Sequence, residues 1–109
     1  MRVEFKYLDG KLTVFLYGEL DHHEIQKSAA DIDQLLDDYM PKDCILDLQN
    51  LSFMDSSGIA LILKLYKKVK LIGGHTSVKH IGSQPRRVLD TAGLDRLIHI
   101  HLEGEVNTL

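Results

Sequence analysis

The sequence predicts an α/β fold: one domain over residues 1–109, with a mostly parallel central sheet, an N-terminal antiparallel hairpin and about three main helices. Two runs rich in β-branched and aromatic residues flank Asp9-Gly10, a pair typical of hairpin turns because both turn positions need positive φ. Segments with helical spacing of apolar residues then alternate with short apolar runs, which favours parallel strands joined by helices. A chain of 109 residues fits one core and predicts no linker.

The N-terminal hairpin is expected to join a strand over residues 3–7 to a second strand over residues 12–17. In the first, Val3, Phe5 and Tyr7 alternate with charged residues, as is typical of a strand. Residues 18–21 are expected to form a loop leading into the first helix.

The first helix is predicted to begin near His22, with Asp21 as its N-cap. Glu24, three residues later, is expected to complete a variant of the capping box with Asp21. Pro41 is expected to close it, because proline cannot continue a helix. One face of this helix is apolar and should pack on the sheet: Ile25, Ala29, Ile32, Leu36 and Tyr39.

The middle of the chain predicts a buried strand over residues 43–48, a loop over residues 51–58 and a largely buried helix over residues 59–71. Gly73-Gly74 should end that helix. Lysines fall on one narrow stripe of it, which we expect to face water: Lys64, Lys67 and Lys68.

The C-terminal part predicts a strand over residues 76–81, a helix from Ser83 to Ala92 and a half-exposed strand over residues 97–102. Ser83 is expected to be the N-cap of the helix and Pro85 to lie in its first turn. The residues beyond Gly104, about 104–109, are expected to form a loose tail.

Composition limits the function classes. A formal net charge of −3 gives no basic excess for nucleic acid, so a protein partner is expected. The single cysteine, Cys44, lies in an apolar stretch and has no partner for a disulfide, which favours the reducing cytoplasm. The first residues lack the apolar core of a secretory signal, and the apolar run over residues 59–63 is too short to span a membrane.

The segment Asp55-Ser56-Ser57-Gly58 lies between the predicted buried strand and the predicted buried helix. One interpretation is structural: an Asp or Ser side chain caps the free N–H groups of the helix. The other is regulatory, because a phosphate on Ser56 would sit where a helix favours an anion and would change the surface charge without unfolding the helix. Both interpretations fit the residues.

Two segments carry a resemblance to a known family: Leu51-Ser52-Phe53-Met54-Asp55-Ser56-Ser57-Gly58-Ile59 and Gly18-Glu19-Leu20-Asp21-His22-His23. The first resembles the phosphorylation signature of the STAS-domain anti-sigma-factor antagonists, and the second resembles another signature of that family at the expected separation. The predicted order of elements also agrees along essentially the whole chain. The Asp-His-His sequence is more similar to the sporulation branch than to the general-stress branch.

The resemblance implies a regulatory protein, not an enzyme. Its unphosphorylated form would bind an anti-sigma factor that is also a serine kinase, and so release a sporulation sigma factor. Phosphorylation of Ser56 would inactivate it, and a separate serine phosphatase would restore it. Nucleotide would belong to the kinase, so no cofactor is expected here. The implied partner surface surrounds Ser56 and includes Asp21, Asp55, Ser57 and Gly58, with Ser57 expected to be a capping or structural hydroxyl.

Alternatives remain within the same family. The phosphoserine segment does not separate a sporulation antagonist from a general-stress antagonist or from a STAS module in a larger assembly. Only the sequence Asp21-His22-His23 favours the sporulation branch.

Enzyme and metal chemistry are disfavoured by the residues themselves. Ser56 with Asp21 and His22 or His23 could suggest a hydrolase triad, but the sequence lacks a Gly-x-Ser-x-Gly elbow. The adjacent His22 and His23 are expected to point in different directions, and the later histidines of the predicted last strand to face solvent, so no metal site is predicted.

Overall fold

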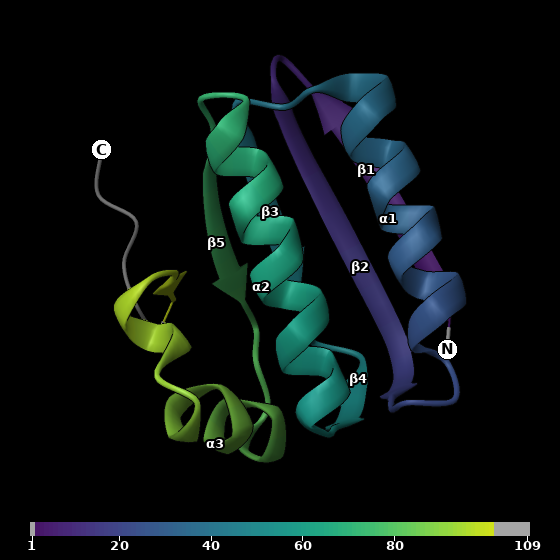
Figure 1. Ribbon diagram of the computed structural model, residues 1–109, viewed down its shortest axis with the longest axis vertical. Coiled ribbons are helices and arrows are strands. Elements are labelled where there is room, and N and C mark those ends of the chain that lie inside the picture. The colour runs from purple at the N-terminus through teal and green to yellow at the C-terminus, as the bar shows by residue number, and fades with distance from the viewer. Residues whose placement is uncertain (1, 102–109) are drawn as a thin grey trace.

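A computed structural model describes residues 2–101, which form a six-stranded mixed sheet with helices packed against it (Figure 1). In chain order the elements are β1 (Arg2–Leu8), β2 (Lys11–Leu20), α1 (Ile25–Tyr39), β3 (Asp43–Asp47), β4 (Leu51–Met54), α2 (Ser56–Leu71), β5 (His75–Lys79), α3 (Ser83–Thr91), the 3₁₀ turn η1 (Leu94–Arg96) and β6 (His99–Ile100).

The sheet has the order β1-β2-β3-β5-β6, and β4 pairs with the far end of β2. Among the strand pairs of residues 2–101, the β1–β2 hairpin alone is antiparallel, as predicted, and its turn places Asp9 and Gly10 at φ 50° and 82°. Both residues therefore adopt the left-handed conformation that a two-residue hairpin turn requires. The other strand pairs are parallel, which places the carboxyl ends of β2 and β4 at one edge.

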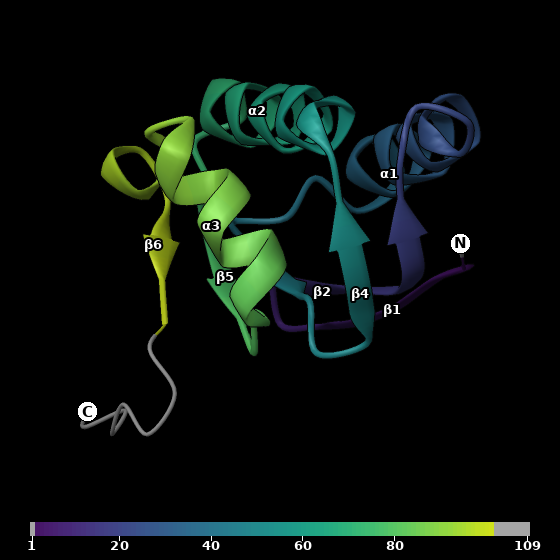
Figure 2. The same ribbon diagram turned by 90° about the horizontal axis from the view of Figure 1, so that it is seen from below.

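Helices α1 and α2 cover one face of the sheet, and α3 lies beside β4 (Figure 2). The core fills the space between this face and the two helices. Alternate residues of β2 point into it, and the expected face of α1 meets them with Ile32 and Leu36 fully buried. Cys44, predicted to lie in a buried strand, is 1% exposed in β3.

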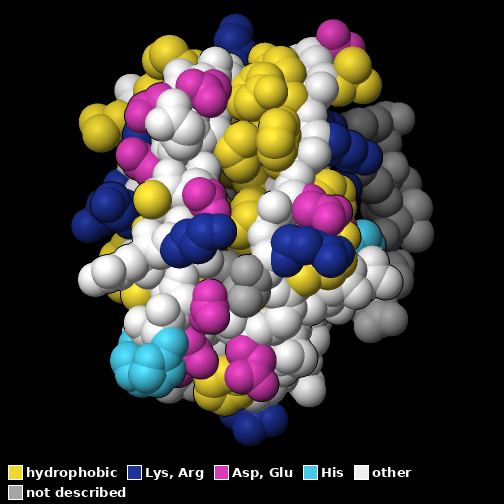
Figure 3. Space-filling model, turned by 90° about the vertical axis from the view of Figure 1, so that its right-hand side faces the viewer, with side chains coloured by type: hydrophobic (Ala, Val, Ile, Leu, Met, Phe, Trp, Pro, Cys, Tyr) yellow, Lys and Arg dark blue, Asp and Glu magenta, His cyan; other side chains and the backbone are white. Residues whose placement is uncertain are grey.

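Hydrophobic side chains gather in a strip on the side of the molecule formed by α1 and β1 (Figure 3). Tyr39 of α1 contacts two aromatic rings of β1 there, with centroid separations of 5.5 Å to Phe5 and 4.7 Å to Tyr7. These tilted contacts hold the edge strand against the helix, because aromatic pairs prefer offset or tilted geometries.

Three expectations about strands and loops were wrong. The predicted loop over residues 18–21 is largely strand, since β2 continues to Leu20 with an irregularity after Gly18. The expected loop over residues 51–58 begins with strand β4. The last strand is shorter than predicted, covering only His99–Ile100 after a 3₁₀ turn, while Leu102 and the predicted loose tail lie outside the described residues.

Helix starts also differ from the predictions. Helix α1 begins at Ile25 rather than near His22. Helix α3 has Gly82 rather than Ser83 at its N-cap position, with no capping hydrogen bond from a side chain.

The lysine stripe of α2 is only partly solvated. Lys64 and Lys67 are exposed, but the Lys68 Nζ atom lies 2.7 Å from Asp33 Oδ1 and 2.7 Å from Asp37 Oδ1 of α1. Lys68 therefore joins the two helices. Within residues 2–101, no helix has the length and apolar character needed to cross a bilayer.

Candidate functional site

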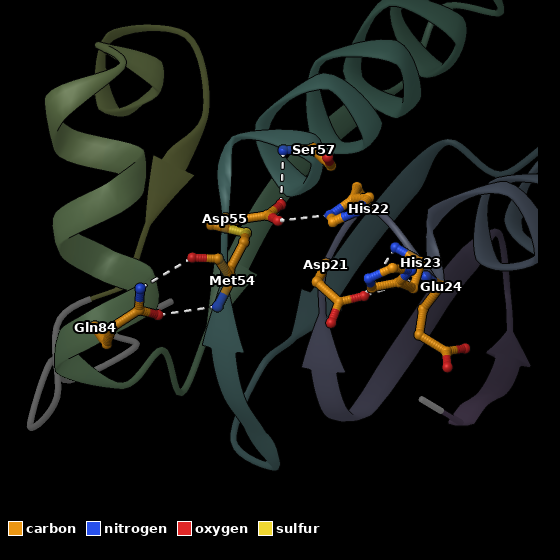
Figure 4. A network of polar contacts seen from close by, with 8 residues as sticks. All are labelled: Asp21, His22, His23, Glu24, Met54, Asp55, Ser57 and Gln84. Atoms are coloured by element: carbon orange, nitrogen blue, oxygen red, sulfur yellow. Dashed lines mark hydrogen bonds and ion pairs between the residues drawn. The ribbon is translucent and has the colours of Figure 1, made fainter.

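The candidate site lies at the edge of the sheet where β2 and β4 end side by side (Figure 4). Leu20 is paired with Met54 in the parallel ladder, and the Asp55 N–H donates to the Leu20 carbonyl at 3.2 Å. The turn that begins at Asp21 and the start of α2 at Ser56 are therefore neighbours. The two segments that resemble family signatures come together through this strand pair.

Asp55 is the N-cap of α2. Its backbone is extended, with φ −107° and ψ −170°, and its carboxylate accepts a hydrogen bond from the Ser57 N–H at 2.8 Å. The expectation that a residue of this tetrapeptide caps the helix is thus confirmed, and the cap is the aspartate.

Hydrogen bonding stabilises the charged form of the Asp55 carboxyl. Partial desolvation is the largest single influence and would raise its pKa. Hydrogen bonds from the Ser57 backbone and hydroxyl, and from the N–H groups of His22 and Gly58, together lower the pKa below its usual range. The carboxylate therefore stays ionised beside Ser56 at neutral pH.

The two serines occupy different environments. Ser56 is the first residue of α2 and is exposed, whereas Ser57 is half-buried and its N–H is bonded to Asp55. Ser56 is therefore the more accessible of the two serines, at the end of a helix where backbone N–H groups favour an anion.

Asp21 stabilises the turn before α1 instead of the helix itself, which corrects the predicted N-cap. Its Oδ1 atom accepts hydrogen bonds from the N–H groups of His23 at 3.0 Å and Glu24 at 3.2 Å. Glu24 occupies the N-cap position of α1 without a side-chain capping bond. Because Asp21 accepts its hydrogen bonds within this short polar turn, it does not cap α1. The helix therefore begins later than its apolar spacing indicated.

His22 and His23 contact each other, contrary to the expectation that they diverge. Their ring centroids are 3.9 Å apart, and His22 Nδ1 lies 3.9 Å from Asp55 Oδ2 (Figure 4). Over residues 2–101, no hydrogen bond joins the Ser56 hydroxyl to a histidine, as a triad would require. In the same range, no group of three or more His, Cys, Asp or Glu side chains could hold a metal ion.

Gly58 packs the first turn of α2 against the sheet. It is buried, and a Cβ atom here would overlap the Met54 side chain and come within 3.1 Å of Leu20 Cδ2. The backbone of α2 can approach the ends of β2 and β4 this closely only because residue 58 has no side chain.

Sequence reasoning missed one residue of this site, Gln84 of α3. Its amide group accepts a hydrogen bond from the Met54 N–H and donates one to the Met54 carbonyl, both at 2.9 Å. Gln84 lies far along the chain and belongs to no signature, so only the folded arrangement of α3 beside β4 reveals its role.

Comparison with known proteins places this arrangement in a family. The STAS domain family matches residues 2–106. An anti-sigma F factor antagonist from Paenibacillus polymyxa is 36% identical over 109 residues, covering 100% of this chain and 92% of that relative.

Solved structures agree with the sequence match. The structure of the anti-sigma factor antagonist SpoIIAA in its unphosphorylated form superposes with a TM-score of 0.79 at 25% identity, covering 97% of this chain and 100% of that one. The Bacillus cell fate determinant SpoIIAA in its phosphorylated form gives 0.71 at 26% identity, covering 94% of each chain. The chain therefore belongs to the STAS domain family and, within it, to the anti-sigma-factor antagonists.

Proposed function

We propose that this chain is a cytoplasmic switch of the sporulation type, controlled by phosphorylation of Ser56. The unphosphorylated form binds an anti-sigma factor that is also a serine kinase and so releases a sporulation sigma factor. Phosphorylation by that kinase ends the binding, and a serine phosphatase reverses it. The chain itself turns over no substrate in this scheme, and nucleotide belongs to the kinase.

The observation that carries this proposal is the exposure of Ser56 beside a capping aspartate. Ser56 is exposed at the start of α2, while the neighbouring Ser57 is half-buried and held by Asp55. A phosphate adds a charge of about −1.5 to −2 next to an ionised carboxylate, at a helix end that tolerates an anion. The surface that a partner meets changes strongly while the helix keeps its cap.

The partner surface is proposed to surround Ser56. Asp21 and Asp55 contribute carboxylates at its rim, and Asp21 holds its turn through Oδ1, which leaves Oδ2 for an arginine of the kinase. Ser57 and Gly58 contribute mainly by fixing the first turn of α2. A phosphate on Ser56 then weakens binding to the ADP-bound kinase by steric clash and like-charge repulsion, at a free-energy cost on the order of several kcal/mol.

Phosphate transfer is the first test. We expect incubation with the anti-sigma kinase and ATP to add one phosphate, located on Ser56 by mass spectrometry of the intact protein and its peptides. The Ser57→Ala variant should still accept it and the Ser56→Ala variant should not. Phosphate on another residue, or no phosphate at all, would contradict the proposed switch, and the Asp-Ser-Ser-Gly segment would then have only the role of a helix cap.

Binding is the second test. In a calorimetric titration against the ADP-bound kinase, we expect phosphorylation to lower affinity on the order of a hundredfold, which corresponds to about 3 kcal/mol. Equal affinity of the two forms would exclude the switch.

The general-stress branch, or a STAS module of a larger assembly, is the alternative. The Asp21-His22-His23 turn favours the sporulation branch. Titration against an anti-sigma kinase of each branch separates them, because the true partner should bind more tightly.

A further inference from the structure

Among the described strands, β4 has a neighbour on one side only. Within the described chain it pairs with β2, and α3 packs beside it on the opposite side (Figure 2). An unpaired strand edge leaves backbone N–H and C=O groups without partners, which is costly where water is excluded. At Met54, whose side chain is fully buried, the Gln84 amide supplies these partners.

The Gln84 amide bonds the Met54 backbone as a residue of a neighbouring strand would, with one acceptor for the N–H group and one donor for the carbonyl group. The Met54 N–H donates to Gln84 Oε1 at 2.9 Å, and Gln84 Nε2 donates to the Met54 carbonyl at 2.9 Å (Figure 4). A carboxamide is the side-chain group with both a donor and an acceptor in this arrangement. The contact therefore fixes the position of the Met54 peptide groups as well as satisfying them.

Met54 lies two residues before the proposed phosphorylation site. Asp55 follows it as the helix cap, and Ser56 begins α2. The peptide group that Gln84 holds is thus connected to the Ser56 hydroxyl through one intervening residue. A shift at the end of β4 would move this hydroxyl relative to a docked partner.

We propose that Gln84 is a positioning residue for phosphoryl transfer to Ser56: it locks the carboxyl end of β4 and so sets where the serine hydroxyl lies in the kinase active site. The inference rests on the proposed function. Displacement of a reacting atom by about 1 Å can cost on the order of a hundredfold in rate, so a loosened strand end should slow transfer even when docking is intact.

The test compares two variants with the wild type in a kinase assay. Gln84→Met keeps the length of the side chain but makes neither hydrogen bond, and Gln84→Glu keeps the acceptor but loses the donor. We expect kcat for Ser56 phosphorylation to fall about tenfold in both at nearly unchanged KM. The matched control Gln49→Glu makes the same amide-to-carboxylate change at an exposed loop residue before β4 and should behave as wild type.

A second readout needs no kinase. When protonated at low pH, the carboxyl of Gln84→Glu regains a donor for the Met54 carbonyl, so the Met54 amide resonance should move back toward that of the wild type at the same pH. Gln84→Met has no titrating group and should show no such return.

The outcomes separate the two proposals. A wild-type chain that takes no phosphate on Ser56 contradicts the proposed function. A wild-type chain phosphorylated there, with Gln84 variants of unchanged kcat, overturns the positioning role. A raised KM at unchanged kcat overturns it as well, because Gln84 would then act in docking. Assays are run below the unfolding temperature of each variant, measured by circular dichroism.

Discussion

At the level of single residues, the first turn of α2 depends on one carboxylate and on one missing side chain. Asp55 holds the Ser57 N–H, and Gly58 lets the helix approach Met54 and Leu20. Both residues act on the position of Ser56 without contacting its hydroxyl in any described interaction. We therefore expect substitutions of Asp55 or Gly58 to act first on the stability of the fold.

Gly58→Ala should destabilise the fold. Its Cβ would overlap the Met54 side chain, and such overpacking costs about 1–3 kcal/mol, offset by up to about 1 kcal/mol of better helix propensity. Urea unfolding followed by circular dichroism should show a lower midpoint. Gly82→Ala is the control, since the nearest atom to its Cβ is 3.9 Å away and its φ of −75° suits alanine. Equal midpoints for both variants would contradict the close packing.

The Asp55 carboxyl should make stability depend on pH. Its pKa in the folded chain is lowered from 3.8, so its contribution is complete above that value and is lost as pH falls through the depressed folded pKa. Asp55→Asn keeps a capping oxygen but does not titrate. Unfolding free energies of the two proteins should therefore converge as pH drops below about 4. A constant difference across this range would argue against the lowered pKa.

At the level of elements, α1 and α2 are joined by a single lysine between two carboxylates. Lys68 reaches both Asp33 and Asp37, and these contacts raise the pKa of Lys68 and lower that of Asp33. All three side chains remain partly exposed, so solvent screens the attraction. The bridge ties the two helices together beside their apolar contacts.

Lys68→Gln should lower the free energy of unfolding by roughly 0.5–1 kcal/mol in low salt, since it also leaves two carboxylates one helical turn apart. High salt should reduce the loss, because surface charges are screened. Denaturant melts at low and at 1 M NaCl measure both effects. Lys67→Gln, at an exposed lysine of the same helix, should show neither; a similar loss there would point to net charge instead of the bridge.

Elements with strong local signals were predictable. The Asp9-Gly10 turn and the apolar face of α1 followed from turn chemistry and periodicity. Strand β4 was missed because four residues are too few to show a period, and its pairing with β2 depends on contacts distant in sequence. The late start of α1 was missed because Asp21 can cap either a turn or a helix, and the sequence Asp-His-His does not distinguish them.

At the level of the whole molecule, the site is assembled from three segments that are far apart in sequence. Two of them carry signatures and were predicted to meet. The third, Gln84, could not be found from sequence, because an isolated glutamine has no pattern and its partner is a backbone group. On the side of the molecule formed by α1 and β1, hydrophobic side chains gather in a strip, with side chains of both charges beside it (Figure 3).

Phosphorylation should leave the fold intact. Ser56 is exposed and the Asp55 cap does not use its hydroxyl, so a phosphate adds charge at a helix end that favours anions by roughly 0.3–1 kcal/mol. Repulsion from Asp55 opposes this gain. Thermal unfolding of the two forms should show one cooperative transition each, separated by a few degrees at most, since about 1 kcal/mol shifts the midpoint of a domain of this size by about 4–8 °C. Loss of cooperativity after phosphorylation would mean that the modification works by unfolding.

The burial of Cys44 gives this molecule a practical property. The chain has one cysteine, which is 1% exposed, and burial raises its pKa to about 12. Thiol reagents act on the thiolate, so this sulfur should stay inert while the protein is folded at neutral pH. A cysteine introduced at the highly exposed Leu71 would then be the sole reactive handle. A fluorophore attached there, at the opposite end of α2 from Ser56, could report partner binding without any need to remove the native thiol.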